Sequence, residues 1–266
     1  MTQESTLDFT SFELPVTSVP DAGGVTEAEL AVRRDLAAAY RLCADFGWDD
    51  LIYTHISARL PGPEHHFLVN PLGLAFDEIT ASNLVKIDLE GRVVGESPYA
   101  PNAAGFVIHG AIHSAREDAG CVMHLHTEAG MALSILEEGL LPLTQHAMRF
   151  HGRIGYHDYE GIALTLAEQE RFIADLGDNT ALILRNHGTL TVGRSVAQAF
   201  VESYYLDKSA RTQLLAQATG RPLRVPPAEV IEKTAHTWVT DLAGSGDREW
   251  PSLVRRLQRS QPGYAD

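Results

Sequence analysis

Two histidines separated by a single residue, His124 and His126, form the sharpest chemical pattern in the chain. They follow the apolar run 121–123, which is typical of a buried strand. Because successive side chains of a strand leave on opposite faces, the two imidazoles share one face if the strand continues through them. Two neutral imidazoles on one face form a pre-arranged pair of metal ligands, although such a pair alone also occurs for purely structural reasons.

A third histidine, His187, supplies what a catalytic metal site needs. It follows the β-branched and apolar run 180–184 and precedes Gly188, where backbone can approach closely. Three histidine ligands with an open coordination position are typical of catalytic zinc, and they also suit Fe(II) with open positions for oxygen. We therefore expect one divalent metal ion per chain, zinc or Fe(II), bound by His124, His126 and His187.

The remaining histidines carry weaker signals. His109 and His113 are four residues apart on one expected helix and therefore share a face. Gly110 stands where the zincin motif has glutamate, so lining a pocket is a better interpretation of this pair than metal ligation. His151 lies in a loop-like segment, where solvated histidines are common, although such a loop could also present substrate-binding groups.

The elements that must position these residues alternate between helix and strand. Capping boxes at Thr26 and Ser195 begin two helices, and a third at Thr165 begins another. We expect further helices over 104–116 and 127–138, strands over 52–60, 67–69, 121–123 and 180–184, and a hairpin joining 84–88 to 92–94. The pattern predicts one α/β domain over 26–220 with a mixed or antiparallel sheet, between a flexible arm (1–25) and a C-terminal helical extension (221–266).

Composition limits the classes of partner. The 266 residues include 21 Lys and Arg against 35 Asp and Glu, for a net charge of −14, which argues against nucleic acid and anionic membranes. No apolar run approaches the roughly 20 residues of a membrane-spanning helix, and the N-terminus shows no secretory signal. Two cysteines cannot make a disulfide framework. We expect a cytoplasmic protein that binds a small molecule.

Four stretches resemble the class II aldolase/adducin family in order and spacing from about residue 26 to 220. They are Thr54-His55-Ile56-Ser57, Val69-Asn70-Pro71-Leu72-Gly73, His124-Leu125-His126 and Arg185-Asn186-His187-Gly188. The chain is most similar to the adducin-head-like branch. The resemblance implies a three-layer α/β/α fold with a central, mainly antiparallel sheet. It also implies a homotetramer with active sites between subunits, and a zinc or similar ion on the three histidines.

The chain departs from the sugar-phosphate aldolases of that family at the positions that bind phosphate. The Ser-Ser-Glu segment of those enzymes is replaced by Ala103-Ala104-Gly105, so the glutamate that acts as acid and base is a glycine here. Thr54-His55 replaces a Gly-Asn pair, and Leu72-Gly73 replaces Thr-Gly. We expect Asn70, Leu72, Gly73 and Ala104 to contact a substrate without a phosphate, because burying a charge without partners is costly.

The retained histidines and the missing glutamate together predict a metal-dependent carbon–carbon lyase. A divalent ion could chelate a hydroxy-carbonyl compound or a 2-oxo acid and act as electron sink in a retro-aldol cleavage or a decarboxylation. Proton transfer would come from one of the following residues: His55, His109, His151 or Tyr159. Two alternatives stay open: a non-haem Fe(II) oxygenase acting on an aromatic 2-oxo or hydroxy acid, and an adducin-like binding module without catalysis.

Overall fold

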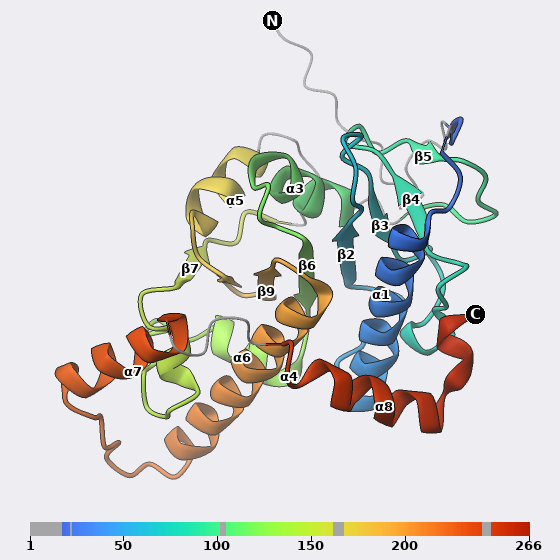
Figure 1. The fold of residues 1–266 in the computed structure, drawn as a ribbon. Helices are drawn as coiled ribbons and strands as arrows, with labels where there is room; N and C mark the ends of the chain where they lie inside the picture. The colour runs from blue at the N-terminus through green and yellow to red at the C-terminus, as the bar shows by residue number, and fades with distance from the viewer. Residues whose placement is uncertain (1–17, 22, 102–104, 162–167, 241–245) are drawn as a thin grey trace, which may run out of the picture.

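The computed structural model describes residues 18–21, 23–101, 105–161, 168–240 and 246–266. Its described strands form one nine-stranded sheet in the order β1-β5-β4-β3-β2-β6-β9-β8-β7 (Figure 1). The strands are β1 (Ser18–Val19), β2 (His55–Arg59), β3 (Phe67–Val69), β4 (Val85–Ile87), β5 (Val93–Val94), β6 (Cys121–Leu125), β7 (Ile154–His157), β8 (Ala181–Leu184) and β9 (Gly188–Gly193). Neighbouring strands are antiparallel except for the pairs β1–β5 and β7–β8.

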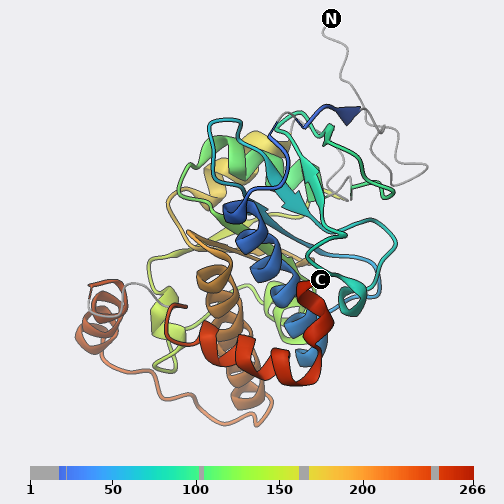
Figure 2. The ribbon, with the colours of Figure 1, turned by 45° about the vertical axis from the view of Figure 1, so that its right-hand side comes forward.

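Helices cover both faces of this sheet. They are α1 (Glu27–Phe46), α3 (Ala111–Ala115), α4 (Glu128–Ser134), α5 (Gln169–Leu176), α6 (Val196–Gln217), α7 (Ala228–Thr240) and α8 (Trp250–Ser260). The helices α1, α6 and α8 pack together on one side, and α3 and α5 lie together on the other (Figures 1 and 2). This arrangement confirms the expected three-layer α/β/α fold with a mainly antiparallel sheet.

The alternation of side chains along β6 divides the core. Met123 and Leu125 pack in the cluster that includes α1 and α6, whereas Val122 packs in the cluster that includes α5 and the residues before and within α3. The same period of two places His124 on the side of Val122. Along β2, Ile56 belongs to the α1 cluster, so His55 and Ser57 also face the α3–α5 side.

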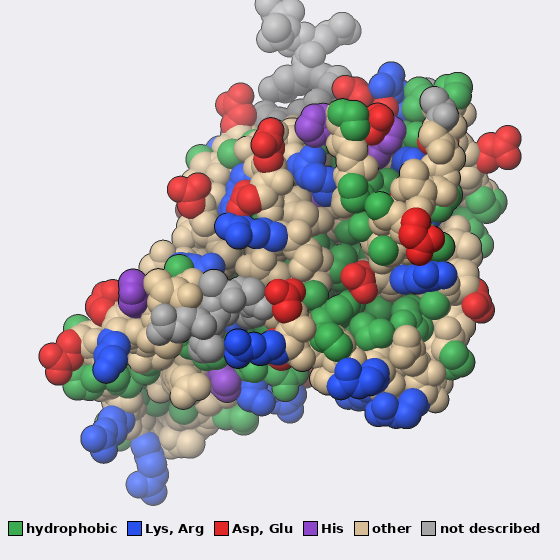
Figure 3. All heavy atoms as spheres, in the orientation of Figure 1, with side chains coloured by type: hydrophobic (Ala, Val, Ile, Leu, Met, Phe, Trp, Pro, Cys, Tyr) green, Lys and Arg blue, Asp and Glu red, His purple; other side chains and the backbone are tan. Residues whose placement is uncertain are grey.

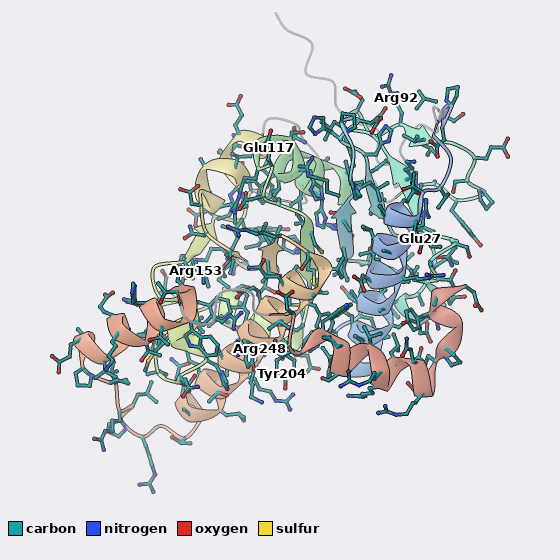
Figure 4. All side chains as sticks on the ribbon, viewed as in Figure 1. Glu27, Arg92, Glu117, Arg153, Tyr204 and Arg248 are labelled. Atoms are coloured by element: carbon teal, nitrogen blue, oxygen red, sulfur yellow. The ribbon has the colours of Figure 1, made fainter. Side chains whose placement is uncertain are left out.

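Several predicted boundaries agree with the structure. The Thr26 side chain accepts a hydrogen bond from the Glu29 amide, and Gly47 ends α1 with a left-handed conformation at φ 67°. Ser195 caps α6 in the same way through the Gln198 amide. The expected hairpin is the antiparallel pair β4–β5, and Arg92 lies at its turn (Figure 4). The capping box expected at Thr165 lies outside the described residues.

Three segments differ from the expectation. Ser18 and Val19, within the predicted flexible arm, pair with β5, and Asp21 binds the Lys86 ammonium at 3.0 Å. Helix α4 ends at Ser134 rather than near 138, because the Ser134 carbonyl, which a longer helix would offer to the amide of residue 138, accepts from the Asn186 amide instead. The expected helix at 104–116 begins, among described residues, with a π-helical turn over Phe106–Gly110.

The predicted C-terminal extension forms α7, α8 and a short 3₁₀ turn over Pro262–Ala265. Trp250, Leu257 and Tyr264 are buried in the same core cluster as α1. The Trp250 indole also donates a hydrogen bond to Asp35 on α1 at 2.9 Å. The extension is therefore part of the main hydrophobic core.

Charged side chains of both signs are interspersed on the described surface. Acidic and basic side chains alternate across the face shown in Figure 3, so the net charge of −14 does not gather into one patch there. No described helix is long and apolar enough to cross a membrane. Both cysteines are buried as free thiols, and burial raises their pKa values.

Candidate metal centre

The structure brings His124, His126 and His187 together at one end of β6. Each offers a nitrogen, and these three atoms lie within 4.8 Å of one another. The three ring centroids are 4.7 to 4.8 Å apart. His124 is on β6 itself, His126 lies just past its end, and His187 lies in the turn between β8 and β9. Because β9 pairs with both β6 and β8, this turn is carried to the end of β6.

Local backbone features make this convergence possible. Asn186 adopts the left-handed conformation with φ 56°, which makes the turn from β8 into β9 tight. The next glycine, Gly188, lies against β6. A Cβ added there would be 2.7 Å from the Leu125 carbonyl oxygen and 3.0 Å from the His126 ring, so only glycine fits the present approach of the two strands.

Hydrogen bonds fix how two of the rings are presented. His124 Nδ1 donates to the Thr189 carbonyl oxygen at 3.1 Å, and His126 Nδ1 donates to an Asp50 carboxylate oxygen at 2.9 Å. Their Nε2 atoms consequently turn toward each other at 2.9 Å. When both rings are neutral, these nitrogens carry facing lone pairs, an arrangement that is repulsive until a cation lies between them. The three-imidazole donor set therefore fits a divalent metal ion.

Burial favours the neutral, metal-binding form of His124 and His187. Desolvation, reinforced by the neighbouring His187, holds the pKa of His124 well below its usual value. Burial and the neighbouring His126 and His157 lower the pKa of His187 to about 4.

Asp50 is the orienting group that could not be identified from the sequence. It lies 76 positions before His126 in the chain, and only the acidic pair Asp49-Asp50 after Trp48 could have signalled it.

Of the four predicted acid–base residues, His55 and His109 form a buried pair near the triad. His55 on β2 is the direct partner of His124 in the β2–β6 register, and their ring centroids are 5.1 Å apart. His55 Nδ1 lies 2.9 Å from His109 Nε2. Burial, with a contribution from neighbouring histidines, lowers the pKa of both rings well below the usual value. No described carboxylate forms an ion pair with either ring.

The other two predicted acid–base residues differ in position. Tyr159 is 53% exposed, and its ring centroid is 6.3 Å from that of His187, with which it lines a small pocket. His151 instead binds Glu232 on α7 at 3.0 Å and has no contact with the triad among its described interactions. The structure therefore leaves three of the four near the metal centre and places His151 in a surface hydrogen bond with Glu232.

The structure describes three of the four predicted substrate-binding residues. Asn70 is fully buried, its Oδ1 accepts a hydrogen bond from the Tyr40 hydroxyl at 2.9 Å, and its Nδ2 has no partner among the described residues. Leu72 and Gly73 form the turn after β3, where Gly73 has φ 90°. Ala104 lies outside the described residues. Asn70 thus has a free donor for a ligand or a water molecule.

Gly105, the counterpart of the family glutamate in the resemblance, lies directly against His55. A Cβ added at Gly105 would be 3.0 Å from His55 Cγ and 3.3 Å from His55 Cβ. Such contacts are tighter than nine in ten real Cβ contacts, so a side chain at position 105 would require the imidazole to shift by a few tenths of an ångström. Gly105 and His55 therefore form one packing unit, in which the absence of a side chain at one position makes room for the ring at the other.

Comparisons with known proteins agree with the fold. The Class II Aldolase and Adducin N-terminal domain model matches residues 34–214. A Caulobacter vibrioides protein named as a candidate class 2 aldolase is 52% identical over 92% of this chain and 95% of its own. Alpha-adducin of Rattus norvegicus is 43% identical over 89% of this chain, which matches 34% of the adducin.

A solved structure shows the same architecture. L-fuculose 1-phosphate aldolase from Glaciozyma antarctica superposes with a TM-score of 0.79 at 30% identity, over 89% of this chain and 92% of that one. The family match and the relatives, taken with the α/β/α layers and the histidine arrangement, lead to one conclusion. The chain belongs to the class II aldolase and adducin family.

Proposed function

We propose that the protein is a divalent-metal-dependent carbon–carbon lyase. Its substrate would be a non-phosphorylated hydroxy-carbonyl compound or 2-oxo acid, cleaved by a retro-aldol reaction or by decarboxylation. The observation that carries the proposal is the pair of facing Nε2 atoms of His124 and His126, each oriented through the other ring nitrogen by Thr189 or Asp50. Orientation of this kind is what a metal ligand requires and what a solvated histidine lacks.

The bound ion would supply Lewis-acid stabilisation of negative charge on an adjacent substrate oxygen. The protein's own residues would do the rest. His124, His126 and His187 hold the ion, and Asp50 holds His126 in the ligating orientation. The choice of a proton-transfer residue is narrowed to His55, His109 and Tyr159, because His151 is engaged by Glu232.

The preference against a phosphate rests on the residues near the site. Thr54 has φ 65°, and its buried Oγ1 has no partner among the described residues. His55 beside it carries no charge in the buried, low-pKa state. Leu72 and Gly73 offer only backbone groups to a ligand. A phosphate dianion held here would lack a charged partner among these side chains, and such burial is costly.

The site would be completed by other copies of the chain. Three apolar or aromatic side chains are exposed next to metal-site residues: Leu51 is 76% exposed, Tyr53 47% and Tyr159 53%. Leu51 follows Asp50 directly, Tyr53 pairs with Asp50 in an isolated antiparallel bridge, and Tyr159 approaches His187. Exposed apolar groups at a site rim are typical of an interface. The family resemblance implies a homotetramer with active sites between subunits, in which these side chains would lie at an interface, and light scattering of the purified protein measures its mass directly.

Metal analysis tests the proposed function. Protein purified without oxygen should contain about one divalent ion per chain, zinc or Fe(II), and cleavage of small hydroxy acids and 2-oxo acids should depend on it. A metal-free protein with an intact fold would contradict the proposal. An iron-loaded protein that consumes oxygen with aromatic 2-oxo or hydroxy acids, and does not release a cleavage product without oxygen, would favour an oxygenase instead.

One comparison favours a second candidate function, a binding module without catalysis. The similarity to alpha-adducin extends over 89% of this chain. Adducin itself is much longer, since the match covers 34% of its length. A cosedimentation assay with actin filaments separates the candidates, because saturable binding by a protein without metal-dependent activity would support the binding module.

A further inference from the structure

We propose that the backbone carbonyl of Ala119 sets the tautomer of His55 through a buried chain of hydrogen bonds, so that His55 presents an unprotonated Nε2 beside the metal centre. His55 Nε2 would then accept a hydrogen bond from a hydroxyl group of the substrate. Ser57 and His113 would act as positioning residues, because they reach the substrate only through other side chains. The use of His55 in a reaction rests on the proposed lyase function, whereas its tautomer does not.

The chain of contacts is continuous. His55 Nδ1 lies 2.9 Å from His109 Nε2, and His109 Nδ1 lies 2.6 Å from Ser57 Oγ. The same hydroxyl lies 2.7 Å from His113 Nε2, and His113 Nδ1 lies 3.0 Å from the Ala119 carbonyl oxygen. All four side chains are at most 3% exposed. The chain therefore runs through the protein interior, where water does not compete for these bonds.

The rings in this chain are neutral. Each is buried, and desolvation disfavours the charged imidazolium. No described carboxylate forms an ion pair with His55, His109 or His113, and the nearest charge to His113 is the Arg59 guanidinium, which disfavours a second positive charge. A neutral imidazole has one donating and one accepting nitrogen, so a bond at one nitrogen determines the role of the other.

The direction of the chain is set at its inner end. A carbonyl oxygen can only accept, so His113 Nδ1 must carry a proton and donate it to Ala119. His113 Nε2 is then an acceptor and receives the single hydroxyl proton of Ser57. Having used that proton, Ser57 Oγ can only accept from His109, so His109 Nδ1 carries a proton.

The same logic continues to the metal centre. With Nδ1 protonated, His109 Nε2 is an acceptor, and His55 Nδ1 must donate to it. His55 Nε2 is left with a lone pair and has no hydrogen-bond partner among the described residues. Every other assignment puts two protons or two lone pairs into one of the four contacts. One carbonyl thus determines the state of a nitrogen three side chains away from His113.

The position of His55 suits this role. Its ring centroid is 5.1 Å from that of His124, and Gly105 leaves the space that the ring fills. A substrate hydroxyl would donate a hydrogen bond to His55 Nε2, and the Nδ1–H bond to the His109 lone pair holds the ring in the orientation that accepts it.

Nitrogen-15 NMR of histidine-labelled, zinc-loaded protein tests the assignment, because protonated and unprotonated ring nitrogens have separate resonances. His55, assigned by its loss in His55→Asn, should show a protonated Nδ1 and an unprotonated Nε2. The variant His113→Phe should reverse the direction of the hydrogen bonds between Ser57, His109 and His55. Ser57 then has only His109 Nδ1 as a described acceptor, so His109 becomes Nε2-protonated and His55 gains a proton at Nε2. Phenylalanine suits this position because the His113 ring already packs against the Phe67 ring, with the two ring centroids 4.9 Å apart.

The control is His236→Phe, an exposed position on α7, which should leave every one of these resonances unchanged. A wild-type His55 with a protonated Nε2 overturns the proposal without any variant, so a His113→Phe protein that fails to fold does not rescue it. An unchanged His55 tautomer in folded His113→Phe protein also overturns it. A metal-bound protein with the expected tautomers but no lyase activity would instead contradict the proposed function alone.

Discussion

Two groups of histidines lie on the same side of the sheet and differ in what their second nitrogens contact. In the metal centre, the Nδ1 atoms of His124 and His126 are bound outward by Thr189 and Asp50, so the Nε2 atoms converge. In the chain from His55 to His113, His109 and His113 each use both ring nitrogens in hydrogen bonds, and His55 uses only Nδ1. Convergence leaves room for a cation, whereas a linear chain leaves a single free nitrogen at its end. The partners of a histidine, and not its presence, decide which role it can take.

The largest expected difference between the two groups of histidines is in their effect on zinc affinity. His124→Ala removes the central ligand and should reduce zinc affinity by more than about 100-fold, because two remaining ligands make a weak site. His113→Phe removes a histidine of the chain and should leave zinc affinity within about twofold. Both are measured by competition with a chelating dye. Equal losses in the two variants would mean that the groups are not separate.

The sequence was sufficient to predict that three histidines converge, but not to predict which groups their other nitrogens contact. The alternation of a strand predicts the shared face of His124 and His126, and a turn glycine marks His187. Helical spacing also places His109 and His113 on one face. The link between those helix residues and Ser57 depends on the packing of α3 against β2, which no local pattern encodes. Asp50 likewise reaches His126 from a distant loop. Local periodicity fixes a side chain's face, but only tertiary packing decides what it meets.

The second largest effect concerns the Asp50 carboxylate, which binds His126 in the metal centre. No described carboxylate forms an ion pair with the histidines from His55 to His113. Asp50→Asn keeps the shape but removes the charge that accepts the His126 Nδ1 proton, and should weaken zinc binding by about 10- to 100-fold. Asp49→Asn is the matched control, since Asp49 is exposed and adjacent, and should bind zinc like the wild type. Isothermal titration with zinc gives both affinities. If the two variants weaken binding equally, net charge and not orientation is responsible.

Acid should destabilise the chain through its buried rings. Burial and Arg59 lower the pKa of His113 from about 6.5 when unfolded to about 3 when folded. The unfolded state therefore binds more protons between these values, and the free energy of unfolding falls as the pH falls through this window. His113 alone contributes up to about 1.4 kcal/mol per pH unit. Urea unfolding of metal-free protein at pH 7, 6, 5 and 4 should show a smaller slope in His113→Phe.

In that experiment His236→Phe serves as the control, because His236 is exposed on α7 and its removal should not change the slope. Parallel curves for wild type and His113→Phe would show that folded and unfolded protein bind a proton at His113 equally well, which contradicts the exclusion of the imidazolium by burial. Below that pKa the direction of the histidine chain would then not be fixed.

The smallest effect tests the packing unit of Gly105 and His55, which joins the two groups. Alanine at position 105 has good helix propensity, and the backbone there is helical at φ −58°, but its Cβ would be 3.0 Å from His55 Cγ. We expect Gly105→Ala to destabilise the wild type by about 1 kcal/mol, as overpacking does. In the His55→Asn background the smaller side chain gives way, and the same change should be neutral or stabilising. A double-mutant cycle measures this coupling as about 1 kcal/mol. Additive effects would mean that the ring moves aside freely, and a mobile ring could not hold Nε2 in one direction toward a substrate.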